Sequence, residues 1–217
     1  MHKLHRGEAP SCLKRHHRTS ANDWQQVSSE DKTEIWEALQ VMQLDLCAYC
    51  ESKITAPKQH IEHFLPRSRC PQKTFDWSNL FGSCNDREHC GKHKDNKQQV
   101  QSYQPADLIK PDEEEPENLL LFVFDGTVAI RHNLAPEDKH RAEETIRVFN
   151  LNAASLKNQR RQAVQGYLSI AEDRSELSDI EWQEYINSEL QEAARHAFVT
   201  AIGHMLMEPD ARHASAK

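Results

Sequence analysis

Four of the six cysteines fall into two pairs, and this spacing limits the fold more than any other feature of the sequence. Two residues separate Cys47 from Cys50, and five separate Cys84 from Cys90. Two such pairs of thiolates can complete a tetrahedral, closed zinc site. The wider second pair leaves His89 as an alternative to Cys90 for the fourth ligand. We therefore expect a structural Zn²⁺ that fastens two distant parts of a small fold.

The composition agrees with a metal-bound protein of the cell interior. Only 37% of the residues are hydrophobic and 28% are charged, which predicts a thin core. The sequence has no apolar run of about 18 residues for a membrane span and no apolar segment of a secretory signal. The lack of both predicts a soluble cytoplasmic chain without a membrane partner, and cysteines in such a chain bind metals more often than they form disulfides. Cys12 and Cys70 are expected to be reduced thiols.

Charge is distributed unevenly along the chain. Residues 1–100 carry 15 Lys and Arg against 13 Asp and Glu, a balance of +2, whereas residues 101–217 carry 12 against 21, a balance of −9. Phosphate attracts basic residues and repels acidic ones. The first half is therefore the candidate for nucleic-acid contact, and the acidic second half is the candidate for docking a protein partner.

The sequence also predicts an order of segments. We expect a basic N-terminal arm at residues 1–20, a Cys/His-rich domain at 21–103, an exposed acidic and Pro-rich linker at 104–118, and a mainly helical region at 119–217. These segments predict an α+β fold.

Apolar periodicity predicts the individual elements. Helices are expected at 28–44, 137–150 and 154–171. A last helix should begin at the capping box of Ser178 and Glu181 and continue through Leu206. The stretch 119–131 is typical of a β-hairpin, and its Asp-Gly dipeptide at 125–126 suits a type I′ turn.

The stretch between the two cysteine pairs predicts catalysis. Glu62 and His63 are adjacent, with apolar residues around them. A carboxylate is a hard ligand for Mg²⁺, and an imidazole can remove a proton from water near neutral pH. Neighbours on a strand point to opposite faces, so a bend at the strand end is needed to bring both to one phosphate. The alternatives are a zinc-ligating or packed His63 and a surface Glu62.

The array CAYC, IEHFLP, WSNLFGSC and CGKHK resembles the HNH endonuclease motif. The resemblance implies a zinc-stabilised ββα-metal core surrounded by helices. It implies His63 as the general base, Glu62 as a ligand of a catalytic Mg²⁺ or Mn²⁺, and Asn79 as a structural residue of the loop. Gly91 stands where this motif has Asn or His, so His93 is the expected second metal ligand, with His89 and Asn85 as alternatives.

Basic side chains gather around this motif. Such charges contact the phosphate backbone without reading sequence, although each one alone can equally be a solvated side chain. The expected nucleic-acid contacts are His60, Arg67, Arg69, Arg87, Lys92 and Lys94.

Further stretches, among them RGEAPSCL and RAEETIRVFNLN, look like the PtuB family. Proteins of this type are the HNH component of Septu-type anti-phage defence, and some are linked to retrons. The resemblance implies an ABC-type ATPase partner similar to PtuA, and for retron-linked members a reverse transcriptase with its RNA–DNA. The rival function is a non-catalytic zinc module that binds nucleic acid or scaffolds the ATPase. The sequence leaves open DNA or RNA, strandedness, the trigger, and the stoichiometry of the complex.

Overall fold

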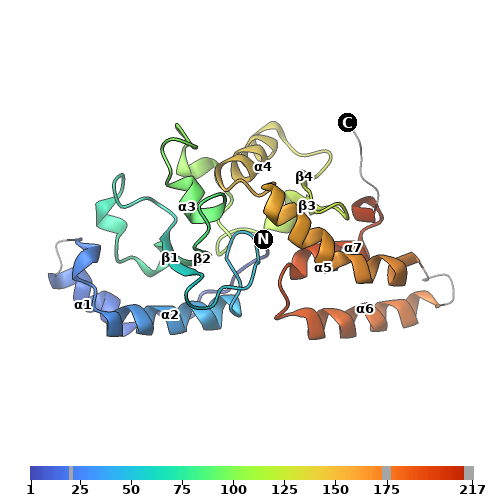
Figure 1. Ribbon diagram of the computed structural model, residues 1–217, viewed down its shortest axis with the longest axis horizontal. Coiled ribbons are helices and arrows are strands. Elements are labelled where there is room, and N and C mark those ends of the chain that lie inside the picture. Colours follow the sequence, from blue (N-terminus) through green and yellow to red (C-terminus); the bar gives the residue numbers. More distant parts are fainter. Residues whose placement is uncertain (20–21, 173–176, 213–217) are drawn as a thin grey trace.

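The computed structural model describes residues 1–19, 22–172 and 177–212, and it shows an α+β arrangement (Figure 1). Helices α1 (Ser11–Thr19) and α2 (Ser29–Gln43) lie on one side of the molecule, and α5 (Ala154–Glu172), α6 (Asp179–Ala193) and α7 (Val199–Met207) lie on the other. Within the described part of the chain, no helix is both long and apolar enough to cross a membrane.

A small ββα unit occupies the space between these two groups of helices. Strands β1 (Gln59–His63) and β2 (Leu80–Cys84) pair antiparallel, with His63 opposite Leu80. The five-residue helix α3 (Cys90–Lys94) follows and packs on β2. Two short strands and one short helix bury little apolar surface by themselves, so this unit depends on its neighbours and on its cysteines.

Helix α2 holds β2 through one buried amide. Ser28 caps the helix as predicted, because its side chain accepts a hydrogen bond from the backbone of Asp31. At the other end, Gln43 Nε2 donates to the carbonyl oxygen of Gly82 at 2.8 Å and Gln43 Oε1 accepts from its N–H at 2.7 Å. An added Cβ at Gly82 would meet Gln43 Nε2 at 3.0 Å, so a larger residue would disturb this bridge.

The segments before and after the Cys/His-rich domain are more buried than the sequence suggested. The expected N-terminal arm contains α1, and its Met1 and Leu4 lie in the core. The boundary expected at residues 20 and 21 lies outside the described residues. The segment 104–118 is not a fully exposed linker, because Leu108 and Ile109 are buried and Ile109 N–H donates to Thr145 Oγ1 at 2.8 Å. Thr145 belongs to α4 (Pro136–Val148).

The predicted hairpin forms, but its turn differs from the expected type. Strands β3 (Leu120–Phe122) and β4 (Val128–Ile130) are joined by a five-residue loop. A type I′ turn needs positive φ at both central residues, whereas here only Gly126 has one, at 87°. The carboxylate of Asp125 accepts from Thr127 N–H at 2.8 Å instead, which stabilises the longer loop.

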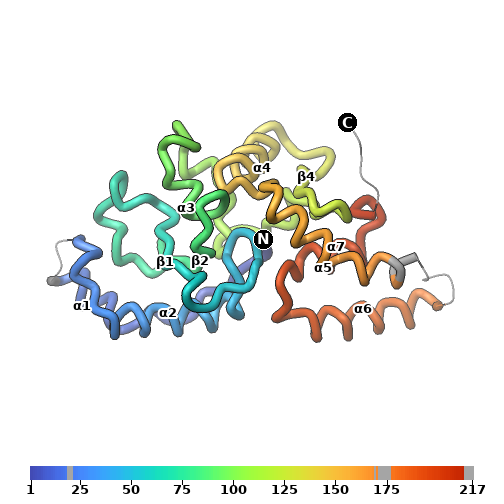
Figure 2. The backbone as a smooth tube through the Cα atoms, in the orientation of Figure 1, coloured from blue at the N-terminus to red at the C-terminus, as the bar shows by residue number. Residues whose placement is uncertain are grey.

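The expected long last helix is two helices. The capping box of Ser178 and Glu181 opens α6 as predicted, but α6 ends at Ala193. Phe198 then adopts a left-handed conformation at the start of α7. Its N–H donates to the carbonyl oxygen of Glu51 at 3.0 Å, and Glu51 Oε2 accepts from Thr200 N–H at 3.0 Å. A carboxylate at a helix N-terminus is favourable, so this contact ties α7 to the loop of the first cysteine pair. Figure 2 shows the chain turning back between α6 and α7.

Candidate active site and zinc-binding cluster

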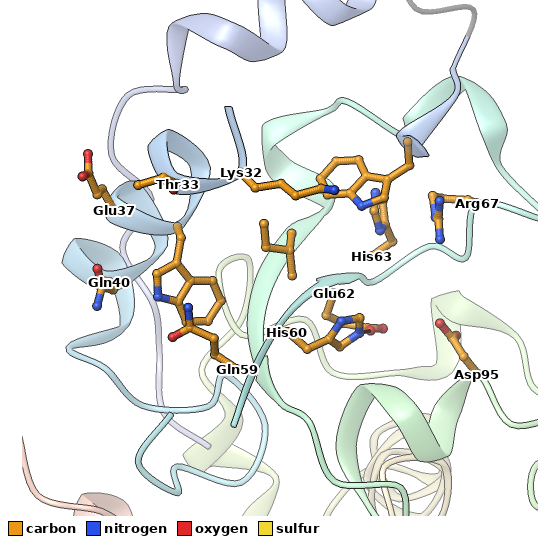
Figure 3. Close-up of a pocket in the computed structure, with 13 residues that line it drawn as sticks. Lys32, Thr33, Glu37, Gln40, Gln59, His60, Glu62, His63, Arg67 and Asp95 are labelled. Atoms are coloured by element: carbon orange, nitrogen blue, oxygen red, sulfur yellow. Dashed lines mark hydrogen bonds and ion pairs between the residues drawn. The ribbon is translucent and has the colours of Figure 1, made fainter. Parts of the chain in front are cut away.

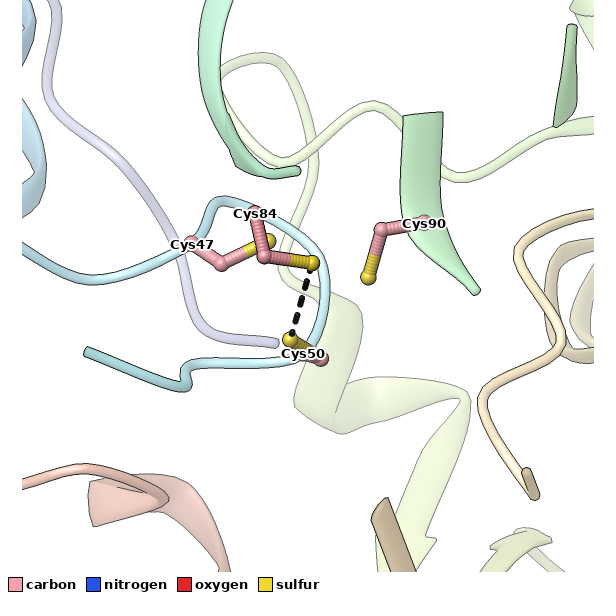
Figure 4. A group of neighbouring side chains, drawn as sticks. All are labelled: Cys47, Cys50, Cys84 and Cys90. Carbon is pink, nitrogen blue, oxygen red and sulfur yellow. Dashed lines mark hydrogen bonds between the residues drawn. The ribbon is translucent and has the colours of Figure 1, made fainter. Parts of the chain in front are cut away.

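The four paired cysteines gather at one point of the fold. Their sulfur atoms lie within 4.8 Å of one another, and all four residues are buried (Figure 4). Cys47 and Cys50 come from the loop after α2, Cys84 ends β2, and Cys90 begins α3. Four thiols at this spacing fit a closed tetrahedral Zn²⁺ site.

Helix α4 supports this cluster from outside. Cys90 has a positive φ of 59°, and its N–H donates to the carbonyl oxygen of Phe149 at 2.8 Å. The Phe149 ring stacks on Tyr49, which lies between the first two cysteines, with ring centroids 4.0 Å apart. The end of α4 therefore contacts both cysteine-bearing segments.

His89 lies against the cluster but does not replace Cys90 in it. Its Nδ1 is 3.4 Å from Cys84 Sγ and 3.3 Å from Cys90 Sγ, and the ring is buried. An imidazole N–H beside ligating thiolates can orient them. The placement favours a supporting role for His89, with four cysteines as the ligand set.

Cysteine labelling is expected to separate the six thiols. With zinc bound, iodoacetamide should modify Cys70, which is part-exposed, and spare the other five. Burial, assisted by Glu34 and Asp31, raises the pKa of Cys12 to about 12, so its reactive thiolate is scarce at pH 8. Peptide mass spectrometry identifies the modified cysteines and measures the rate of labelling at each one. Labelling of Cys12 as fast as Cys70 would contradict this environment.

Glu62 and His63 line the same cavity, which has a volume of about 540 Å³ (Figure 3). Both residues are buried, although they are neighbours on β1. Trp24 covers one edge of His63, with ring centroids 4.6 Å apart at an interplanar angle of 87°. Arg67 and Asp95 lie at the same cavity from two different loops. The cavity has the size of a small-ligand or nucleotide site.

The His63 ring is fixed in one orientation. Its Nε2 lies 3.0 Å from the carbonyl oxygen of Thr74, so Nε2 carries the proton and donates it. Nδ1 then holds the free lone pair. Burial lowers the pKa of His63 to about 4, although the nearby charge of Glu62 raises it. His63 is therefore neutral at pH 7 and able to accept a proton at Nδ1.

Glu62 is ionised, and each of its two carboxylate oxygens has a basic partner. Its Oε2 accepts from His60 Nε2 at 2.9 Å, and its Oε1 lies 2.9 Å from Lys94 Nζ. Burial acts to raise the pKa of Glu62, but the charges and hydrogen bonds of Lys94 and His60 together outweigh it and lower the pKa to about 2. A buried carboxylate in this state is a strong ligand for a cation.

Asn79 closes the loop between the two strands. Its Oδ1 accepts from Leu65 N–H at 2.7 Å, and its Nδ2 donates to the carbonyl oxygens of Leu65 and Lys73 at 3.2 and 2.9 Å. This loop also carries Thr74, the acceptor of His63. Asn79 thus acts on backbone groups and positions the candidate base indirectly.

Replacing Asn79 by alanine is expected to lower the free energy of unfolding by about 2 to 4 kcal/mol, because three backbone groups lose their partner. Ser78→Ala, at the exposed neighbouring position, is the matched control. Urea unfolding of both variants measures the difference. Equal stability of the two variants would show that the loop closes without this side chain.

His93 and its two alternatives do not reach the cavity of Glu62. The His93 ring lies against α4, where Nδ1–H donates to the carbonyl oxygen of Val148 at 2.8 Å. Asn85 is exposed beside Cys84, at a different cavity. Gly91 and Lys94 are the α3 residues that face Glu62, because residues three apart share one face of a helix.

Five of the six expected nucleic-acid contacts divide into three groups. Arg67, on the surface, lines the cavity of His63, where His60 also lies. Arg69 lies over the Tyr103 ring, 4.7 Å from its centroid, at a second cavity that shares Arg67 and Asp95 with the first. Exposed positions outside both cavities are Arg87 and Lys92.

Contrary to the sequence prediction, Lys94 is not available to contact phosphate. It is buried, and its ammonium is paired with Glu62 and Asp95 inside the protein. Asp95 and Trp24 also line the cavity, although the sequence did not single them out as parts of the site. Asp95 directly follows the CGKHK stretch, and Trp24 precedes the helix that leads to Cys47. No pattern of residue spacing identifies either of them as part of the site.

The antiparallel β1–β2 pair, α3, the four-thiol cluster and the Glu62–His63 cavity together form the type of core expected of a zinc-stabilised HNH endonuclease. The chain is similar to a protein of Vibrio cholerae serotype O1 biovar El Tor named "Retron Vc95 putative HNH endonuclease". The two are 28% identical over 159 residues, which cover 70% of this chain and 71% of that protein. Comparison with protein-family models finds no match. The similarity supports the HNH resemblance of the sequence.

Proposed function

We propose that this chain is a metal-dependent HNH endonuclease that hydrolyses phosphodiester bonds of nucleic acid, with DNA as its substrate. The observation that carries the proposal is the state of His63. It is buried and neutral, with Nε2–H on Thr74 and with Nδ1 left as a base beside the carboxylate of Glu62. A zinc module that only binds has no need of this pair.

His63 acts as the general base in the proposed reaction. Nδ1 takes a proton from a water molecule, whose oxygen bonds to the phosphorus as the P–O bond to one sugar oxygen breaks. That sugar oxygen leaves and takes a proton from solvent, while the bond from Nε2–H to Thr74 keeps the ring in place. Asn79 holds the loop that carries this acceptor. In many hydrolytic sites a third group orients the catalytic base, and here the Thr74 carbonyl orients the His63 ring.

The cavity needs a cation before it can receive a phosphate. Lys32 and Arg67 oppose Glu37, Glu62 and Asp95 among its charged residues, a balance of 2 − 3 = −1, and the buried Lys94 brings it to zero. A surface without net positive charge does not attract phosphate by itself.

The oxygen and nitrogen donors that line the cavity are of the types that bind Mg²⁺ or Mn²⁺. Glu62, Asp95 and His60 line the cavity, and we propose them as its ligands in place of the Glu62–His93 pair that the sequence suggested. When bound, the ion supplies charge neutralisation at the phosphate oxygens. The Cys47, Cys50, Cys84 and Cys90 cluster is proposed to hold a separate structural Zn²⁺.

The substrate strand is proposed to pass along the two joined cavities. Arg67 lies at both, and Arg69 and Lys97 extend the basic surface of the second one. Arg87 and Lys92 are proposed as outer contacts to the phosphate backbone, since both are exposed near the core.

We further propose that the chain is the effector of a cytoplasmic anti-phage complex of the Septu type with an ABC-type ATPase. The PtuB resemblance and the similarity to a retron protein support this, and a retron reverse transcriptase with its RNA–DNA is a second candidate partner. Purification of the chain together with the products of its neighbouring genes tests the complex. A chain that elutes alone from such a preparation would contradict it.

The rate of cleavage is expected to stay nearly constant from pH 8 down to pH 6. The pKa of His63 is lowered to about 4, so only about 1% of the base is protonated at pH 6, whereas an ordinary histidine would be mostly protonated there. A pH profile of kcat/KM measures this. A loss of activity with a midpoint near 6.5 would show that a solvent-exposed histidine is the base.

A substrate panel separates the proposed function from the zinc-module alternative. Plasmid DNA, single-stranded DNA and RNA are incubated with the purified complex and Mn²⁺, and both cleavage and gel-shift binding are recorded. Cleavage of one of them supports the nuclease. Binding that is as tight for His63→Ala as for the wild type, without cleavage by either protein, supports the zinc module.

A further inference from the structure

The Lys94 side chain places a positive charge at Glu62, where a metal ion is proposed. Its ammonium is 2.9 Å from Glu62 Oε1, 2.5 Å from Asp95 Oδ1 and 3.1 Å from the carbonyl oxygen of His63. The side chain is fully buried, with 0% of its surface exposed. Three oxygen atoms around one buried cation resemble the oxygen coordination that a divalent metal ion prefers.

Gly91 is necessary for this arrangement. An added Cβ at position 91 would lie 2.3 Å from Glu62 Oε2 and 2.5 Å from its carboxyl carbon. A metal-ligating Asn or His at this position would therefore collide with the carboxylate in its present place. Gly91 and Lys94 thus place a close backbone and a buried ammonium against Glu62 on one face of α3.

The donors of the proposed catalytic ion are not gathered around one point while Lys94 stands between them. Among the described residues, three or more metal-binding side chains come within 4.8 Å of one another only at the four cysteines and at Cys12, Asp31 and Glu34. Glu62 and Asp95 are each in contact with the ammonium instead.

We infer that Lys94 is an internal counter-ion that competes with Mg²⁺ or Mn²⁺ for Glu62, so that metal binding displaces its ammonium. Two cations cannot share one buried carboxylate oxygen without strong repulsion. The displaced ammonium can turn to solvent on the side of Asp95, because the side chain of Asp95 is 45% exposed while that of Glu62 is 1% exposed. The inference rests on the proposed metal dependence of this site.

The first test measures metal affinity without any cleavage. Zinc-loaded wild type, Lys94→Met and Lys92→Met are titrated with Mn²⁺, and free Mn²⁺ is followed by electron paramagnetic resonance. Lys94→Met is expected to bind one Mn²⁺ at least tenfold more tightly than wild type, because the competing charge is gone. Lys92→Met removes the same charge from the exposed side of α3, and its affinity should equal that of wild type.

Equal or weaker Mn²⁺ binding by Lys94→Met would overturn the inference. Glu62→Gln should lose the gained affinity when it is combined with Lys94→Met, which assigns the ion to this carboxylate. Zinc remains in the cysteine cluster during the titration, since thiolates prefer it to Mn²⁺. Because no step of this test reads cleavage, a failure of the nuclease proposal leaves the result interpretable.

A second test uses the wild-type protein and does not depend on how the variant folds. Amine acetylation by a water-soluble ester is followed at each lysine by mass spectrometry, with and without saturating Mn²⁺. Lys94 is expected to be protected without the ion and to react several-fold faster with it, while the exposed Lys92 reacts equally in both. Protection of Lys94 that is unchanged by Mn²⁺ would show that the ammonium stays at Glu62.

Discussion

Replacement of His63 by alanine is expected to lower the rate of nucleic-acid cleavage by about 10² to 10⁴-fold, the contribution of one general base. The Thr74 carbonyl fixes the proton of the ring at Nε2, which leaves Nδ1 as the base. Its removal leaves the cysteine cluster untouched, because His63 contacts none of the four thiols in the described structure. Single-turnover cleavage of a labelled duplex measures the rate, and elemental analysis measures the zinc.

His132→Ala is the matched control for this variant. His132 is exposed after β4 and lies at none of the cavities of the ββα unit, so the same substitution should leave the rate unchanged. A His63→Ala protein that cleaves at the wild-type rate would refute the assignment of the base. Loss of zinc from that protein would instead identify His63 as part of the zinc site.

Replacement of Cys50 by serine is expected to abolish zinc binding and to unfold the ββα unit. Structural zinc contributes on the order of 10 kcal/mol to small zinc domains, which is comparable to the whole stability of a typical domain. The unit has two five-residue strands and a five-residue helix, so its own core cannot offset this loss. Hydrogen exchange of residues 59–94, together with the zinc content, measures the effect.

Cys70→Ser is the control, because Cys70 is a cysteine of the same region that lies outside the cluster. It should keep its zinc and its protection from exchange. A Cys50→Ser protein with full zinc and normal exchange would mean that the remaining thiols and His89 hold the ion without Cys50.

Local patterns predicted the parts of the molecule that depend on short stretches of sequence. The Ser28 cap, the capping box at Ser178 and the strand pairing at 120–130 follow from neighbouring residues, and the structure contains each of them. The gathering of four cysteines also follows, since two knuckles that share an ion must meet.

The features that the sequence did not reveal depend on contacts between distant segments. The break before α7 arises where Phe198 bonds to Glu51, a residue of the first cysteine loop. The burial of Leu108 and Ile109 depends on α4. Spacing along the chain does not encode such contacts.

The candidate site shows the same division. Glu62 and His63 stood out as adjacent residues with complementary chemistry. The roles of Lys94 and Asp95 depend on the direction in which α3 faces β1, and Gly91 becomes informative only once Glu62 is seen against it. Lys94 therefore looked like a phosphate contact in the sequence, and it is a buried partner of the carboxylate in the structure.

Cleavage of plasmid DNA by the purified complex, with wild type and His63→Ala side by side, shows whether His63 is the base of a metal-dependent nuclease. Each protein is assayed with Mg²⁺ and with a chelator dose that leaves its measured zinc content unchanged. We expect the wild type to cut with Mg²⁺ and to stop without it, and His63→Ala to be inactive with its zinc intact. Equal cleavage by the two proteins, or cleavage that continues without a divalent ion, would contradict this expectation.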